Sequence, residues 1–282
     1  MPRTLILGGR GQLGRDLERL FAKKSEVTSV DLPEVDIAAE GCVSHLASDI
    51  RPDVVLNAAA YTDVEKAEDD EAAAFRANET GARYAAQAAK AVDAPIVFYS
   101  TDYVFGGVQT RPYIEADDVA PIGVYARSKL AGERATMEEN PRHLILRTAW
   151  LYGPGGNNFV EKIIRLARTH PEIKVVEDEI GAPAYTGDLA KATLTLLKRG
   201  ACGIYHVTNA GTCTRYEFAQ EILKLAGIDT PIAPCASSEF PTKAERPLYS
   251  VLATEKLQET AGYTPRHWKD ALADYFTRRE TS

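Results

Sequence analysis

Short apolar runs alternate with longer stretches of helical character over the first 150 residues of the chain. The runs predicted to be strands are Thr4–Leu7, Val27–Val30, Val54–Leu56, Ile96–Ser100 and Leu144–Arg147. The clearest helical stretch between them is Ala72–Val92, which is rich in Ala, Glu, Arg and Gln. Strands that alternate with helices predict βαβ units with right-handed crossovers. Because several of these strands are almost wholly apolar, we expect an α/β fold with a doubly wound parallel sheet.

This rhythm loosens after Arg147, where a glycine- and asparagine-rich turn spans 153–158. The elements expected beyond it are helices at Phe159–Arg168, Asp188–Lys198 and Tyr216–Ala226, a strand at Lys174–Val176, and a Pro-rich stretch from Pro231 to Pro247. We therefore expect residues 1–150 to form the sheet domain. Residues 151–282 should form mainly a smaller C-terminal lobe, with one or more segments returning to the sheet.

Composition narrows the function classes. The chain has 282 residues and a formal net charge of −7, which argues against a nucleic-acid partner because binding to a phosphate backbone needs a basic face. No apolar stretch is long enough to span a membrane, and the first residues lack the apolar run of a signal peptide. The four cysteines and five histidines show no metal-binding or disulfide spacing. We expect a cytoplasmic protein with no membrane association.

A glycine-rich turn follows the first predicted strand directly. Gly8, Gly11 and Gly14 are spaced three apart, with Gln12 and Leu13 opening the helix that follows. Glycines at this spacing allow a tight turn, let the backbone approach a pyrophosphate, and let the helix pack on the strand. The helix N-terminus then offers free N–H groups to phosphate. This context predicts a dinucleotide-binding site.

The end of the second strand bears on which dinucleotide binds. Asp31 lies 20 residues after Gly11, where a carboxylate can accept a hydrogen bond from the adenosine 2′-hydroxyl and repel a 2′-phosphate. Arg10 lies inside the turn and could contact a 2′-phosphate. Asp31 could also be a helix cap or turn residue. The preference between NADH and NADPH therefore stays open.

Tyr125 and Lys129 are spaced four apart at the start of a predicted helix, so their side chains share one face. A free phenol has a pKa of about 10, and a neighbouring ammonium would lower that pKa towards the working range. Thr101 follows the fourth strand, and the third strand runs into small residues at 57–60 that include Ala58 and Ala60. Ligands of open parallel sheets bind beyond these strand ends. The pattern predicts an acid–base site that contacts the cofactor.

Together these features resemble the extended short-chain dehydrogenase/reductases, which have a Rossmann-type sheet. The segments NAAAYTDVEKAE (57–68), YSTDYVF (99–105), VYARSKLAGE (124–133), LRTAWLYG (146–153), NNF (157–159), GAPAYTGDLA (181–190) and RPLYSVL (246–252) are similar to the dTDP-4-dehydrorhamnose reductases. This resemblance covers nearly the whole chain. It implies reduction of the C4 keto group of dTDP-4-dehydro-L-rhamnose to dTDP-L-rhamnose by NADH or NADPH.

The resemblance also implies roles for individual residues. Tyr125 would donate the proton, Lys129 would assist it and hold the cofactor ribose, and Thr101 would polarise the carbonyl. Around the cofactor, Gly11, Gln12 and Leu13 would meet the pyrophosphate, Asp31, Asp36 and Ile37 the adenosine, and Ala60, Tyr61, Thr62 and Tyr99 the nicotinamide side. The substrate, a dTDP-4-keto-6-deoxy sugar, would meet Thr101, Asp102, Tyr103 and Trp150.

Other readings of the sequence stay open. Trp150 could fill the core, Asn157 and Asn158 could only shape a turn, and Arg246 could either orient the nucleotide or brace the C-terminal segment. Asp16 matches one carboxylate of an Mg²⁺ site at the dimer interface of some family members. The other carboxylates of that site are not clearly reproduced near Asp188, so Mg²⁺ is doubtful and the protein could be a monomer or a homodimer.

Two alternative functions are a different sugar-nucleotide epimerase or reductase, and a non-catalytic regulatory subunit resembling the methionine adenosyltransferase β subunit. A dehydratase is disfavoured, because dehydratases carry an acidic pair after the hydroxyl and here Thr101 is followed by Asp102 and Tyr103. Cofactor binding without turnover of a ketosugar would identify a regulatory subunit.

Overall fold

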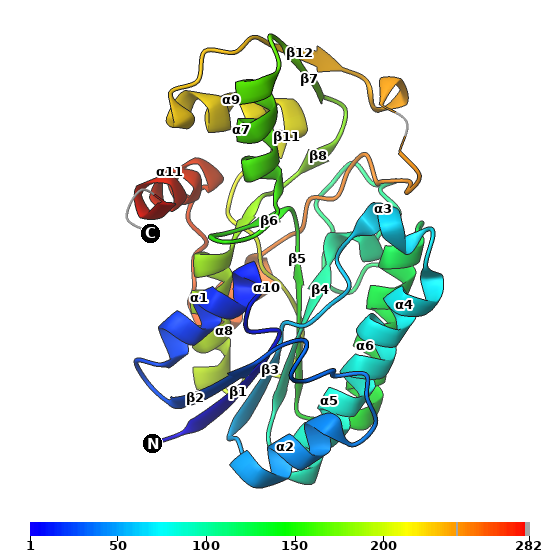
Figure 1. Cartoon of the computed structure of the whole chain (residues 1–282), viewed down its shortest axis with the longest axis vertical. Coiled ribbons are helices and arrows are strands. Elements are labelled where there is room, and N and C mark those ends of the chain that lie inside the picture. The colour runs from blue at the N-terminus through cyan, green and yellow to red at the C-terminus, as the bar shows by residue number, and fades with distance from the viewer. Residues whose placement is uncertain (241, 280–282) are drawn as a thin grey trace.

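A computed structural model describes residues 1–240 and 242–279; Pro241, in the predicted Pro-rich stretch, and the last three residues of the expected C-terminal lobe lie outside the described residues. The chain forms a large sheet-centred part with a smaller helical part above it (Figure 1).

The large part is built on a six-stranded sheet with the order β10-β5-β4-β3-β1-β2, and every neighbouring pair is parallel. The strands are β1 (Arg3–Leu7), β2 (Glu26–Val30), β3 (Val54–Asn57), β4 (Ile96–Thr101), β5 (His143–Thr148) and β10 (Gly203–His206). The order reverses between β1 and β3, which is where such sheets bind ligands. The predicted doubly wound α/β fold is therefore confirmed.

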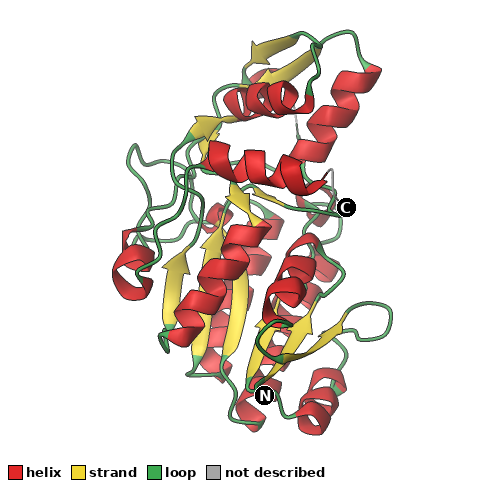
Figure 2. Ribbon diagram, turned by 90° about the vertical axis from the view of Figure 1, so that its left-hand side faces the viewer, coloured by secondary structure: helices red, strands yellow, loops and turns green. Residues whose placement is uncertain are grey.

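Helices cover both faces of this sheet (Figure 2). One face carries α2 (Cys42–Ile50), α5 (Gly81–Ala91) and α6 (Val124–Glu139), and the other carries α1 (Gln12–Phe21), α8 (Thr186–Lys198) and α10 (Glu255–Ala261). Apolar side chains fill the space between the helices and both faces, which explains why the strands are apolar throughout. The elements α8, β10 and α10 all come from beyond residue 150.

The helix predicted at 72–92 is interrupted. It consists of α4 (Glu71–Phe75), a π-helical turn at Arg76–Thr80, and α5. Asn78 lies in the π-helical turn and is buried, with its side-chain amide bonded to the backbone of Tyr61 and to the Ser128 hydroxyl. These tertiary contacts give a physical reason for the interruption, and a pattern of apolar positions does not contain them.

The smaller part has its own apolar core, centred on Phe218 and Tyr152. Its helices are α7 (Phe159–Thr169), α9 (Arg215–Ala226) and α11 (Trp268–Arg279), and its two-stranded pairs are β7 (Ile173–Val176) with β12 (Ile232–Cys235), β6 (Leu151–Tyr152) with β9 (Ala184–Tyr185), and β8 (Ile180–Gly181) with β11 (Cys213–Thr214). The predicted strand at 174–176 is thus β7, and its partner comes from the Pro-rich stretch. The division of the chain at residue 150 stays a prediction.

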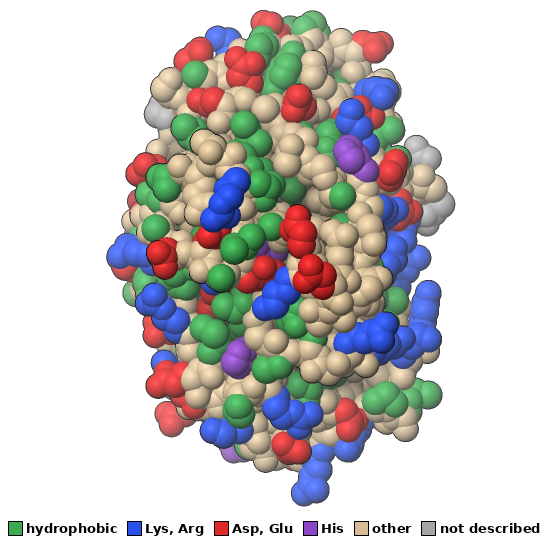
Figure 3. Space-filling model, turned by 180° about the vertical axis from the view of Figure 1, so that it is seen from behind, with side chains coloured by type: hydrophobic (Ala, Val, Ile, Leu, Met, Phe, Trp, Pro, Cys, Tyr) green, Lys and Arg blue, Asp and Glu red, His purple; other side chains and the backbone are tan. Residues whose placement is uncertain are grey.

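Acidic and basic side chains both occur over the face shown in Figure 3. Within residues 1–240 and 242–279, no helix is both long enough and apolar enough to cross a bilayer. The cytoplasmic location and the choice between monomer and homodimer stay predictions.

Candidate functional site

The glycine-rich turn joins β1 to α1 at the point where the strand order reverses. Gly8 has a φ of +82°, and a Cβ there would lie 2.5 Å from the backbone nitrogen of Ala59 in the loop after β3. A Cβ on Gly14 would lie 2.2 Å from the Gly8 carbonyl oxygen, so this glycine lets α1 pack against the turn. At Gly11 the surroundings are more open, with only the Gly8 oxygen near a would-be Cβ, at 3.3 Å. The turn is therefore a cradle shaped by the absence of side chains.

Helix α1 begins at Gln12 with Gly11 as its N-cap, and no described side chain caps its first turn. The helix N-terminus can therefore donate backbone N–H groups to an anion, with the favourable end of the helix dipole behind them. Leu13 is buried in the core, so only its backbone faces the turn. The residues present thus fit a dinucleotide pyrophosphate.

The end of β2 presents a second group of polar residues. Asp31 accepts hydrogen bonds from the backbone N–H groups of Arg10 and Leu32, both at 2.8 Å. Asp36 pairs with Arg76, and this contact lowers the pKa of its carboxyl group. Ile37 is buried, and a Cβ at Gly81 would strike its side chain at 2.6 Å. These residues line the place expected for an adenosine.

The loop after β3 is held at one point. It runs through Ala58, Ala60, Tyr61 and Thr62 to the short helix α3 (Val64–Ala67). The Asn78 carbonyl oxygen accepts from the Tyr61 N–H at 2.9 Å, and its amide donates to the Tyr61 carbonyl at 3.1 Å. A side chain in the π-helical turn thus fixes the backbone of this loop.

Thr101, Tyr125 and Lys129 converge beyond the end of β4. Thr101 ends the strand, and its hydroxyl lies within hydrogen-bonding reach of the Tyr125 phenol in the first turn of α6. Burial raises the pKa of Tyr125, and the contact with Thr101 partly offsets that rise. A phenol in this state stays protonated near neutral pH, as a proton donor must.

Lys129 lies one turn further along α6 and is only 3% exposed. Its Nζ donates to the Tyr99 carbonyl at 2.6 Å and lies 4.1 Å from the centre of the Phe98 ring. Burial lowers the pKa of this ammonium to about 7, while the Glu133 charge acts in the opposite direction. The Tyr99 phenol is on the other side of the strand, 3.2 Å from the Thr193 hydroxyl, so Tyr99 faces Lys129 only through its backbone.

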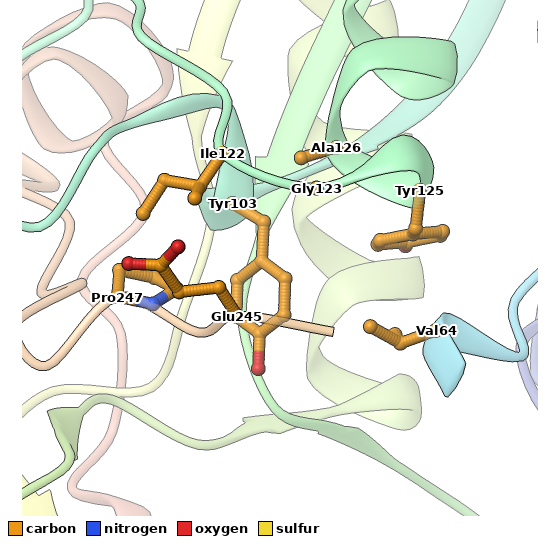
Figure 4. A pocket seen from close by; sticks show the side chains of 8 residues that line it. All are labelled: Val64, Tyr103, Ile122, Gly123, Tyr125, Ala126, Glu245 and Pro247. Carbon is orange, nitrogen blue, oxygen red and sulfur yellow. The ribbon is translucent and has the colours of Figure 1, made fainter. Parts of the chain in front are cut away.

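A small, open pocket lies beside Tyr125. Side chains from α3, from the turn after β4, from α6 and from the segment at 245–247 meet there (Figure 4). The Tyr103 ring is edge-on to the Tyr125 ring, with the centroids 6.3 Å apart. The longer segment at 242–247 is tied to the α3 region by two ion pairs, Arg246 with Glu65 at 2.6 Å and Lys243 with Asp69 at 2.6 Å. Arg246 therefore braces the C-terminal segment in this structure.

Trp150 lies between the two parts of the molecule with a strained backbone φ of 45°. Its ring contacts Gly181 on one side, where a Cβ would come within 2.6 Å, and the Arg215 guanidinium lies 3.6 Å from its centroid. Arg215 also pairs with Glu179 at 3.2 Å. The Arg215 charge favours ionisation of the buried Asp102, whose pKa burial nevertheless raises to about 6. Arg215 thus stacks on Trp150 within electrostatic range of Asp102, and Asp102 accepts a hydrogen bond from the Thr101 hydroxyl at 3.1 Å.

Three other positions named from the sequence have structural partners. The buried Asp16 accepts a hydrogen bond from Thr186 at 2.5 Å, and Asp188 pairs with Arg266 at 2.6 Å. Asn158 accepts from the Glu161 N–H, which caps α7. Across the described part of the chain, no three His, Cys, Asp or Glu side chains gather as a metal site would require.

Sequence reasoning missed three residues that shape this site. Arg215 comes from a helix start far along the chain, and Asn78 lies within the helix predicted at 72–92. Glu68 accepts from the Val124 N–H at 2.8 Å and so caps the helix that carries Tyr125. An asparagine within a predicted helix was the one available signal, because polar residues of this type disfavour helix interiors unless tertiary contacts hold them.

A doubly wound sheet with a glycine cradle at its first strand and a Thr–Tyr–Lys cluster beyond its fourth defines a nicotinamide-dependent oxidoreductase of the short-chain type. Residues 2–281 match the family described as the RmlD substrate binding domain, and the chain belongs to that family.

Individual relatives agree with this assignment. The chain is 40% identical to the spore coat polysaccharide biosynthesis protein SpsK of Bacillus subtilis, over 100% of this chain and 99% of that protein. Among solved structures, a dTDP-4-dehydrorhamnose reductase from Clostridium acetobutylicum has a TM-score of 0.96 with 42% identity, covering 99% of both chains. A dTDP-4-dehydrorhamnose reductase from Bacillus anthracis, solved in complex with NADP, also has a TM-score of 0.96, with 37% identity, 99% of this chain and 100% of that one. The resemblance noted in the sequence is confirmed.

Proposed function

We propose that this protein reduces the C4 keto group of dTDP-4-dehydro-L-rhamnose to give dTDP-L-rhamnose, with NADPH or NADH as reductant. The observation that carries this proposal is the convergence of Thr101, Tyr125 and Lys129 at the strand ends beside the glycine cradle. The printed names of relatives about 40% identical over the whole chain support the choice of substrate.

The chain's own residues hold the cofactor in this proposal. The turn from Gly8 to Gly14 and the N-terminus of α1 bind the pyrophosphate, and Asp31 and Ile37 bind the adenosine end. Ala58, Ala60, Tyr61 and Thr62 line the nicotinamide side, with Lys129 on its ribose. When bound, the dihydronicotinamide supplies the hydride.

Acid catalysis then falls to the buried cluster. Thr101 and Tyr125 donate hydrogen bonds to the C4 oxygen, and these bonds strengthen as negative charge develops on it. Tyr125 transfers its proton to that oxygen. Lys129 stabilises the phenolate left behind, since a nearby positive charge favours the ionised form of a phenol. The low polarity that raises the pKa of Tyr125 also strengthens these electrostatic contacts.

The smaller part is proposed to bind the sugar nucleotide. Trp150 offers an aromatic surface, Asp102 and Tyr103 offer polar groups, and Arg215 offers a positive charge for the diphosphate of the substrate. The pocket beside Tyr125 has room for about one water molecule, far less than a sugar nucleotide needs. We therefore expect the segment at 242–247 to shift when the substrate binds.

The test compares the wild type with Tyr125→Phe, following NADPH or NADH oxidation at 340 nm with dTDP-4-keto-L-rhamnose generated in situ. We expect turnover in the wild type and a loss of about a hundredfold or more in the variant, the scale of lost acid catalysis. Tyr84→Phe, on α5, is the matched control and should keep wild-type activity. If the wild type binds cofactor yet turns over no ketosugar, the proposed substrate is wrong and the regulatory-subunit alternative takes its place.

A further inference from the structure

Arg10 occupies an unusual place in the glycine turn. Its backbone N–H donates to the Asp31 carboxylate at 2.8 Å, so the residue lies directly beside the group expected to meet the adenosine ribose. Its guanidinium extends to the loop after β2, where Nη2 contacts the Glu34 carboxylate at 2.5 Å and Nη1 contacts the Leu32 carbonyl at 2.9 Å. The Arg10 guanidinium, near the place expected for the ribose, is thus paired with the Glu34 carboxylate, which lies outside the glycine turn.

The other charges nearby are already engaged. Both Asp31 oxygens accept backbone N–H groups, which offsets part of the charge that would repel a 2′-phosphate. Arg76, towards the adenosine end, pairs with Asp36, and the Arg15 guanidinium donates to the Arg10 carbonyl at 3.0 Å. Arg10 is also paired, but its backbone N–H binds Asp31, so its side chain starts beside the carboxylate expected at the ribose.

The contact between Arg10 and Glu34 can be exchanged at little cost. The two side chains are 60% and 57% exposed, and exposed ion pairs contribute little to stability. A phosphate monoester carries nearly two negative charges at neutral pH and three acceptor oxygens, and it matches the fork of a guanidinium. A 2′-phosphate should therefore bind Arg10 more tightly than Glu34 does, but it must first displace Glu34.

We infer that Glu34 sets the cofactor preference by competing with the 2′-phosphate of NADPH for Arg10, while Asp31 serves the 2′-hydroxyl of NADH. This inference rests on the proposed function only in placing the cofactor at the glycine turn. Glu34 weakens the binding of NADPH. It does not change the affinity for NADH, which carries no 2′-phosphate for Arg10 to bind.

Binding measurements on the ligand-free protein test this inference without any turnover. Fluorescence titration gives Kd for NADPH and NADH, and calorimetry compares adenosine 2′,5′-bisphosphate with 5′-AMP. Glu34→Gln should tighten NADPH and the bisphosphate about two- to fivefold, and Arg10→Met should weaken both about tenfold or more, whereas NADH and 5′-AMP change less than twofold. Glu138→Gln, which removes an exposed carboxylate on α6, is the matched control. It should change neither the ratio of the Kd values for NADPH and NADH nor that for the bisphosphate and 5′-AMP.

The outcomes separate two failures. If both cofactors bind but Glu34→Gln leaves the ratio of their Kd values unchanged, the inference is overturned and the proposed function stands. Equal weakening of NADPH and NADH by Arg10→Met also overturns it, because the substitution would then act through the turn backbone. If neither cofactor binds to the wild type, the proposed function fails and the inference fails with it.

Discussion

A buried ion pair fixes the helix that carries Tyr125 and Lys129. Glu133 lies one turn beyond Lys129 on α6, and its carboxylate binds Arg147 of β5 through two parallel hydrogen bonds of 2.9 and 2.8 Å. The side chains are 0% and 3% exposed, respectively. Glu133→Gln would keep the shape but leave the Arg147 charge uncompensated inside the protein.

The surroundings determine the size of this effect. The Arg147 guanidinium lies 5.1 Å from the Phe105 ring centre, and its Nη1 has no hydrogen-bond partner among the described residues. His206 is close by, but burial, together with the Arg147 charge, lowers its pKa to about 3, so it stays neutral. Glu133 is therefore the anion that balances Arg147. Breaking such a buried pair from one side typically costs about 3–5 kcal/mol, which corresponds to a fall of roughly 6–20 °C in Tm.

Urea unfolding followed by circular dichroism measures this loss. Glu138→Gln is the control on the same helix, since Glu138 is 68% exposed and its pair with Arg83 should contribute under about 1 kcal/mol. The double variant Glu133→Leu with Arg147→Met removes both charges and should recover at least half of the loss, because apolar replacements of a buried pair are often neutral. If Glu133→Gln is no less stable than Glu138→Gln, the electrostatic reasoning is refuted.

Two further predictions follow from the shifted pKa values. Because the pKa of Lys129 is about 7 in the ligand-free protein, its ammonium is lost as the pH rises through that value. kcat/KM for the ketosugar should therefore fall above about pH 7, and Lys129→Met should show lower activity without that fall; an unchanged pH profile in the variant contradicts the assignment. Raising the pKa of Asp102 from 3.8 to about 6 makes its buried ionised form cost roughly 3 kcal/mol of folding free energy at neutral pH. This penalty is present above about pH 6 and disappears as the pH falls towards 3.8, so the wild type should gain about 1–1.5 kcal/mol more than Asp102→Asn between pH 7.5 and pH 5. If urea unfolding shows that the wild type and Asp102→Asn gain the same stability between pH 7.5 and pH 5, Asp102 is not held in this state.

The sequence was informative where chemistry and local pattern coincide. The apolar strands, the glycine turn and the spacing of Tyr125 and Lys129 depend on short segments, so these features could be read without the structure. The strand β10 could not be, because its four residues carry no pattern of their own and take their place only by pairing with β5 at the edge of the sheet. The same holds for Arg215, whose stacking on Trp150 joins segments 65 positions apart.

The least predictable contacts are the ones that hold α6. Glu68, from the α3 region, caps the first turn of α6. Asn78, in the π-helical turn, binds the Ser128 hydroxyl, and Arg147, in β5, forms an ion pair with Glu133. These three contacts come from separate elements and lie along the stretch that carries Tyr125 and Lys129. A proton donor must be held within a fraction of an ångström of its productive position, which needs support around the helix as well as the reactive groups on it. The reactive pair can be recognised from its spacing, whereas the support that makes the pair effective exists only in the folded chain.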